Sequence, residues 1–125
     1  MAVPPLLITF VQGSTIFREP DLAPGLPVLR NGPPGTFVDI PRGLRVSLPT
    51  DQIVWTENRD GRVQVGFGGM RWSGPHEGRL VFTRVRELHP ENALSPDRSH
   101  TMILDPAWVT SVRQDGRQVW PVSVP

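Results

Sequence analysis

Two Asp-Gly dipeptides, each lying between apolar runs, constrain the fold of this chain more than any other feature. They are Asp60–Gly61 and Asp115–Gly116. A two-residue hairpin turn of type I′ requires positive φ at both central residues, and Asp-Gly meets that requirement readily. The sequence therefore predicts two β-hairpins, over 52–67 and 104–122, and a β-rich domain around them.

Prolines and short apolar segments extend this prediction to the rest of the chain. Fifteen of the 125 residues are proline, which removes backbone donors and blocks helix interiors. Further strands are predicted at 6–12, 36–40, 44–48, 79–88 and 101–104. We expect an all-β fold, a small single-domain barrel or sandwich of about eight to ten short strands with no long helix.

The connections between these strands carry local signals. Glycines between 66 and 78 predict a flexible or tightly turned loop. Asp105–Pro106 is typical of a cap followed by a first turn position, and His89–Leu94 of a single helical turn. Pro121 places the last strand at a sheet edge or at a bulge.

The N-terminal part of the chain differs in composition from the rest. We expect 1–35 to form a strand followed by a Pro/Gly-rich extended arm, and 36–125 to form the β-rich globular domain. The arm carries apolar residues without a regular period, which indicates that it lies on its own domain or on a neighbouring subunit. The candidate partner-binding residues in it are Leu22, Leu26 and Leu29.

Charge and composition narrow the function. The formal net charge is +1, so non-specific attraction to nucleic acid is expected to be weak. The absence of cysteine excludes a disulfide framework and thiolate chemistry. The apolar run at 6–11 is too short to span a membrane and lacks a basic segment before it. We expect a soluble protein without a signal peptide or membrane segment, and leave open whether it acts in the cytoplasm or in a virion.

No catalytic or metal-binding constellation is predicted. His76, His89 and His100 lack the spacing of a zinc site. Ser73 stands near His76, but a glycine-rich loop accounts for that proximity without a nucleophile. Gly66–Gly69 is not followed by a helical pattern, so a phosphate cradle is not indicated. We expect no enzyme activity, no cofactor and no metal. A small hydrolase using His76 or His100 is the least favoured alternative.

Trp72 and Arg71 are the candidate partner-binding pair outside the arm. The chain has four tryptophans, and two or three suffice for the core of so small a domain. Trp72 lies beside Arg71 in the predicted glycine-rich loop. Because tryptophan and arginine are enriched at interface hot spots, this pair is a candidate anchor for a protein partner.

Four short segments of the chain, taken in order, also resemble the pattern of a known family of domains. Ile53–Glu57 and Val63–Val65 give a strand, a turn and a returning strand, and Ser99–Asp105 and Pro121–Val124 come later. In this order they resemble the LytTR-type DNA-binding domains of bacterial response regulators, over residues 44–125. The resemblance implies a transcriptional regulator that binds DNA.

The basic positions of that family's motif are changed in this chain. The motif's histidine and arginine correspond to Ser99 and His100, and its last arginine to Val124. Missing basic side chains weaken contact with DNA phosphates. In a DNA-binding protein of this type, Arg71, Arg98 and His100 would contact phosphates and bases.

The favoured function is a non-enzymatic, β-rich interaction or assembly protein that binds a protein partner or a second copy of itself. A phage virion structural or accessory protein, with the arm as a clamp, fits this description by analogy. The alternative is a LytTR-like DNA-binding regulator.

Overall fold

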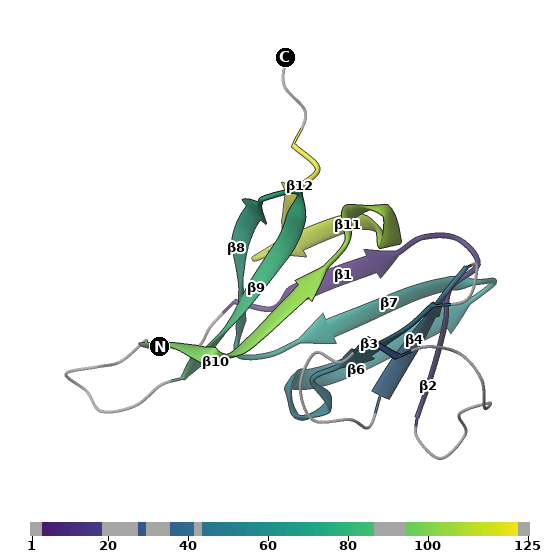
Figure 1. Cartoon of the computed structure of the whole chain (residues 1–125), viewed down its shortest axis with the longest axis horizontal. Helices are drawn as coiled ribbons and strands as arrows, with labels where there is room; N and C mark the ends of the chain where they lie inside the picture. Colours follow the sequence, from purple (N-terminus) through teal and green to yellow (C-terminus); the bar gives the residue numbers. More distant parts are fainter. Residues whose placement is uncertain (1–3, 19–27, 30–35, 42–43, 87–94, 123–125) are drawn as a thin grey trace.

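The computed structural model describes residues 4–18, 28–29, 36–41, 44–86 and 95–122, and it is all-β, as predicted (Figure 1). Twelve strands are present in these residues, more than the eight to ten expected, and they form three sheets that are not closed into a barrel. The strands are β1 (Leu6–Phe10), β2 (Thr15–Arg18), β3 (Val28–Leu29), β4 (Thr36–Ile40), β5 (Leu44–Leu48), β6 (Ile53–Arg59), β7 (Arg62–Phe67), β8 (Met70–His76), β9 (Arg79–Arg86), β10 (Ser95–Leu104), β11 (Val109–Gln114) and β12 (Arg117–Trp120).

Both predicted hairpins are present, and both lie in the five-stranded sheet, whose order is β12-β11-β1-β7-β6. The turn between β6 and β7 has φ of 54° at Asp60 and 76° at Gly61. The turn between β11 and β12 has 54° at Asp115 and 74° at Gly116. β1 pairs antiparallel with β7 on one side and β11 on the other, so the N-terminal strand joins the two hairpins into one sheet.

The three-stranded sheet, of order β10-β9-β8, corrects the prediction of a glycine-rich loop. β8 is a strand of seven residues that pairs antiparallel with β9. Gly74 has φ of 100° beside an irregularity in that pairing, and Glu77 and Gly78 turn the hairpin with φ of 50° and 75°. These glycines therefore supply special backbone conformations inside a hairpin, and not the freedom of a loop.

The four-stranded sheet has the order β2-β4-β5-β3, and β4 and β5 have the bounds expected from the sequence. In β5, Val46 faces the hydrophobic core between the sheets, whereas Arg45 lies on the opposite face of its sheet. That second face is also buried, since Arg45 is 3% exposed and Phe37 1%. The Arg45 side chain donates from Nε to Asp39 at 3.3 Å, which compensates for its burial.

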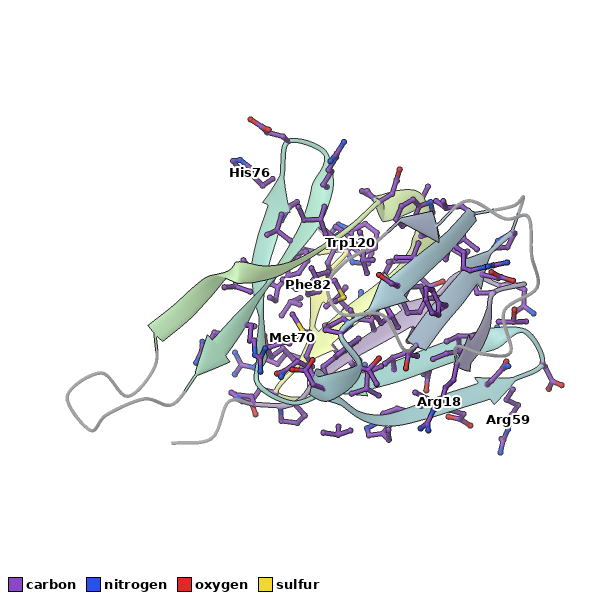
Figure 2. The ribbon with its side chains drawn as sticks, turned by 60° about the horizontal axis from the view of Figure 1, so that its bottom comes forward. Arg18, Arg59, Met70, His76, Phe82 and Trp120 are labelled. Carbon is purple, nitrogen blue, oxygen red and sulfur yellow. The ribbon has the colours of Figure 1, made fainter. Side chains whose placement is uncertain are left out.

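One hydrophobic core lies where the three sheets meet. Val63, Val65 and Phe67 of β7 are fully buried in it, which confirms that they share a face. Phe82 and Met70, from the three-stranded sheet, are also buried in the core, in the interior seen in Figure 2. The core thus needs side chains from every sheet, and removing one sheet would expose the apolar faces of the other two.

The described parts of 1–35 belong to these sheets. β1 and β2 pair with strands from later in the chain, and β3 pairs parallel with β5. A boundary at residue 35 would therefore divide strands that are hydrogen-bonded to one another. The predicted extended arm falls mainly on 19–27 and 30–35, which lie outside the described residues, as does the predicted helical turn at 89–94.

Two smaller expectations are confirmed. Asp105 caps the 3₁₀ turn η3 (Pro106–Trp108), because its Oδ1 accepts a hydrogen bond from the Ala107 backbone N–H at 2.8 Å. Pro121 follows β12 directly, and β12 is an edge strand. No helix among the described residues has both the length and the apolar character that a bilayer crossing requires.

Candidate functional site

The outer strand β6 carries the most exposed apolar surface of the five-stranded sheet. Val54 is 63% exposed and Trp55 is 44% exposed. The pairing of β6 with β7 shifts register between Ile53 and Trp55, so Val54 is an extra residue with no partner opposite it. The bulge interrupts the alternation of faces and leaves two neighbouring apolar side chains in solvent.

One glycine on the neighbouring strand β7 and one just after it determine where these two side chains lie. A Cβ at Gly66, the cross-strand partner of Trp55, would overlap the Trp55 indole. A Cβ at Gly68 would come within 3.2 Å of Val54 Cγ1. Trp55 therefore lies flat over a strand position without a side chain, as aromatic residues do beside strand glycines. We call Val54 and Trp55 the edge pair.

Gly66→Ala is expected to lift the Trp55 indole from the sheet and to lower the free energy of unfolding by about 1–3 kcal/mol, because the added methyl group overpacks the site. In a Trp55→Ala background the same change is expected to stabilise the fold by about 0.5–1 kcal/mol, since alanine is preferred to glycine in a strand. Urea unfolding of the four proteins measures the coupling. An equal effect of Gly66→Ala in both backgrounds would contradict the packing of Trp55 on Gly66.

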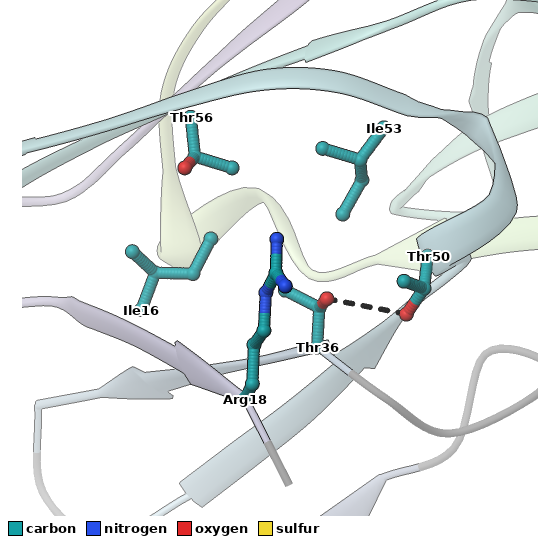
Figure 3. Close-up of a pocket in the computed structure, with 6 residues that line it drawn as sticks. All are labelled: Ile16, Arg18, Thr36, Thr50, Ile53 and Thr56. Atoms are coloured by element: carbon teal, nitrogen blue, oxygen red, sulfur yellow. Dashed lines mark hydrogen bonds between the residues drawn. The ribbon is translucent and has the colours of Figure 1, made fainter.

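A cleft of about 220 Å³ lies beside β6, where the edge of the four-stranded sheet meets the edge of the five-stranded sheet (Figure 3). Two strands and one turn provide most of its lining: β2, β6, and the 3₁₀ turn η1 (Thr50–Gln52). Its lining residues are Ile16, Arg18, Thr36, Thr50, Ile53 and Thr56. Residues from four separate elements therefore meet in this cleft.

Pairing registers explain why these side chains converge. Arg18 lies opposite Thr36, next to the Ile16–Val38 pair that faces the core, so Arg18 projects to the core side of the four-stranded sheet. Thr56 lies opposite the buried Val65 and so projects to the core side of the five-stranded sheet. The two sheets thus direct these residues at each other from facing edges.

The described lining of the cleft carries one charge, and it is positive. Arg18 is the only ionisable side chain among the described residues that line the cleft, and Figure 3 shows its guanidinium group pointing into the space between the isoleucine and threonine side chains. Thr50 donates its hydroxyl proton to Thr36 Oγ1 at 3.2 Å. The cleft therefore combines a cation, hydroxyl groups and two apolar walls.

Two other hollows are described. One, of about 450 Å³, lies at the tip of the β6–β7 hairpin, where Gln12 Nε2 donates to the Asp60 carbonyl at 2.6 Å and Arg62 Nε donates to Gln12 Oε1 at 3.3 Å. Its remaining charges are the Asp60 carboxylate and the pair Glu57 and Arg59, whose charged groups lie 3.6 Å apart. This hollow therefore combines carboxylates with its arginines, so it is less suited to an anion than the Arg18 cleft.

The third hollow, of about 360 Å³, lies at the tip of the β8–β9 hairpin and includes His76. His76, labelled in Figure 2, has its Nε2 3.9 Å from the Glu77 carboxylate, and both side chains are exposed. No group of three or more His, Cys, Asp and Glu side chains with metal-binding geometry occurs within the described ranges. His76 therefore has one exposed acidic neighbour and no further partner for hydrolytic chemistry in the described part of the chain.

The predicted pair Trp72 and Arg71 lies on strand β8. Trp72 is half-buried against the core, with its ring centroid 5.3 Å from that of Phe82, and its backbone N–H donates to Gln114 Oε1 at 2.9 Å. Arg71, on the opposite side of the strand, is exposed. Their role in partner binding stays a prediction, with much of Trp72 occupied by core packing.

The other predicted residues are described less completely. Leu22 and Leu26 lie outside the described residues, and Leu29 is placed by its backbone in β3, opposite Val46. Arg98 and His100 are placed by their backbone in β10, two strands away from Arg71 across β9. DNA binding by these residues stays a prediction of the sequence resemblance.

Neither the edge pair nor the Arg18 cleft is among the residues predicted from the sequence. Two adjacent apolar residues within an otherwise alternating strand are a signal of a bulge, and Ile53–Val54–Trp55 carries that signal. Arg18 has no comparable signal, because its partners in the cleft come from other strands.

No protein family model, curated protein or solved structure matches this chain. A function can therefore be proposed only from the arrangement of the described residues.

Proposed function

We propose that this chain is a non-enzymatic interaction protein that binds an extended segment of a protein partner as an added strand along β6. The observation that carries the proposal is the exposure of Val54 and Trp55 side by side on an edge strand. Adjacent apolar side chains at an unpaired sheet edge are typical of strand-addition sites, where main-chain hydrogen bonds supply affinity and side-chain contacts supply specificity.

The backbone of β6 supports this mode of binding. Among the described strands, β6 pairs with β7 alone, so every second residue directs its N–H and C=O groups away from the sheet. The charged residues that discourage strand addition, Glu57 and Arg59, are confined to the turn end of the strand. Ile53–Thr56 is uncharged, and it is the part of the edge that a partner would meet.

Charge complementarity favours a different protein over a second copy of this chain. A strand added to β6 would direct alternate side chains to the core side, beside the Arg18 cleft. The core-side residues of β6 itself are Ile53, Thr56 and Asn58, none of which is acidic, whereas Glu57 lies on the outer face. A second β6 would therefore leave Arg18 unmatched, and an acidic segment of another protein would match it.

A peptide selection tests the proposal. Random linear peptides displayed on phage are selected on the full chain, and the most enriched peptide is synthesised and titrated by fluorescence anisotropy. Val54→Lys is expected to weaken its binding by about tenfold or more, because it removes apolar contact and adds a charge to the edge. Val122→Lys is the matched control: Val122 is 68% exposed and lies outside β6, so its replacement is expected to leave the affinity unchanged.

Amide hydrogen exchange locates the bound peptide. The outward amides of β6 are expected to gain protection when the peptide binds, and those of β12, the opposite edge, to remain as they were. Equal affinity of the wild type and Val54→Lys, or a peptide that protects β12 in place of β6, would overturn the proposal. The proposal would also be overturned if the displayed peptides were enriched on this chain no more than on an unrelated β protein.

A further inference from the structure

We infer that the Arg18 cleft binds a carboxylate group, with Arg18 as its charged partner and Thr36 as a hydroxyl donor. As a recognition site for an acidic side chain of the added strand, the cleft depends on the function proposed above. As a binding site for a carboxylate of any source, it depends only on the residues that line it.

Arg18 is available for such a ligand. Within the described residues, no hydrogen bond or ion pair joins Arg18 to another side chain, and none of those that line the cleft is acidic. Among the described arginines, Arg45, Arg59 and Arg84 each lie within 4 Å of a carboxylate, whereas Arg18 does not. A guanidinium group that faces a cleft without an anion is suited to bind one through two parallel N–H donors.

Thr36 adds a second donor. Thr36 is 4% exposed, and its Oγ1 accepts a hydrogen bond from the Thr50 hydroxyl group. A hydroxyl group donates one hydrogen bond and accepts up to two, so the Thr36 proton is still free to be donated into the cleft. The resulting order, Thr50 to Thr36 to ligand, polarises each bond in turn and strengthens the last one. An anion would accept from both Thr36 and Arg18.

Size and walls favour a carboxylate over a phosphate. The cleft, at about 220 Å³, is smaller than the roughly 300–1,000 Å³ of drug-sized ligand sites, and fits one short side chain or a small acid. Ile16 and Ile53 provide apolar contact for the carbon chain next to the charged group. A single arginine matches the one negative charge of a carboxylate, and leaves part of the charge of a phosphate uncompensated.

The position of the cleft connects it to β6. Ile53 and Thr56 line the cleft from the core side of β6, so a side chain on the same side of an added strand would lie next to them. From there an aspartate or glutamate side chain would extend toward Arg18. The edge of β6 would then bind the partner's main chain, and the Arg18 cleft would select an acidic residue at one position.

Titration with propionate and with its uncharged analogue propionamide tests the cleft directly. Propionate is expected to shift the NMR signals of the Arg18 Nε–Hε group and the Thr36 amide in a saturable manner, with a dissociation constant in the millimolar range. Arg18→Gln is expected to weaken propionate binding by about tenfold or more, since it removes a charge-assisted hydrogen bond. Arg117→Gln removes an exposed arginine of β12, at the opposite edge of the five-stranded sheet, and is expected to leave binding unchanged.

Arg18→Lys and inorganic phosphate complete the test. Lysine keeps the charge but not the two parallel donors, so the lysine variant is expected to bind more weakly than the wild type and more tightly than Arg18→Gln. Equal shifts with propionate and propionamide, propionate binding that survives Arg18→Gln, or saturation by phosphate at lower concentrations than propionate would each overturn the inference.

The Val54→Lys variant separates this inference from the proposed function. It blocks the edge of β6 without touching a cleft residue, so it is expected to lose the selected peptide and to keep propionate binding. If no peptide binds the edge but propionate still binds at Arg18, strand addition is wrong and the carboxylate site stands. If peptides bind the edge equally well in the wild type and Arg18→Gln, strand addition stands and the role of the cleft in selecting an acidic residue is wrong.

Discussion

Phe82→Ala is expected to lower the free energy of unfolding by about 3–5 kcal/mol, the usual effect of removing a buried phenyl ring. Phe82 is fully buried, lies on the central strand of the three-stranded sheet and contacts Trp72. Since small domains are stable by only about 5–15 kcal/mol, this single change is expected to bring the fold near its limit. Urea unfolding followed by tryptophan fluorescence gives the value.

Two controls define what the Phe82 result means. Phe82→Leu keeps most of the volume and is expected to lose much less stability than the alanine variant. Val54→Ala removes methyl groups from an exposed position and is expected to change stability by less than about 0.5 kcal/mol. A loss of under about 1 kcal/mol in Phe82→Ala would mean that the three-stranded sheet contributes little to the common core.

Gln114→Met is expected to lower the free energy of unfolding by about 2–4 kcal/mol, because it removes three hydrogen bonds. The Gln114 side chain donates to the carbonyls of Met70 at 2.9 Å and Pro4 at 3.1 Å, and accepts from the Trp72 N–H at 2.9 Å. It therefore joins β11 of one sheet to β8 of another and to Pro4, two residues before β1. Methionine has nearly the same shape and cannot replace any of these bonds.

Gln118→Met is the matched control for this prediction. Gln118 is exposed on the adjacent strand β12 and donates one hydrogen bond, to the Pro121 carbonyl at 2.9 Å. Its replacement is expected to lower stability by about 0.5–1 kcal/mol. Chemical denaturation of both variants under the same conditions compares them, and equal losses would show that Gln114 does not link the two sheets.

Local backbone chemistry explains which parts of the fold the sequence predicts. The Asp-Gly turns specify positive φ at two successive residues, so both hairpins and the flanking apolar strands are predictable from a few residues. The β8–β9 hairpin has the same pair of positive φ values at Glu77 and Gly78. Glutamate is rarely found there, so the turn carries no comparable signal and the segment resembles a loop.

The candidate site depends on contacts that no local pattern encodes. Arg18 and Thr56 lie on strands of different sheets, and they face one cleft because two sheet edges meet there. Trp72 shows the reverse case: its glycine-rich surroundings predict a loop residue, yet the pairing of β8 places it in a strand and against Phe82. Residue type indicates what a side chain can bind, and only the packing of the sheets determines what it contacts.

The position of β1 also imposes an order on synthesis. β1 is made before both of its neighbours, and β11 is made after β7. Until β11 has been translated, β1 can pair only with β7, and its other edge stays open to any exposed strand nearby. A nascent chain that stalls before β11 is therefore expected to be the form most prone to aggregate, and the C-terminal hairpin serves as the element that covers this edge.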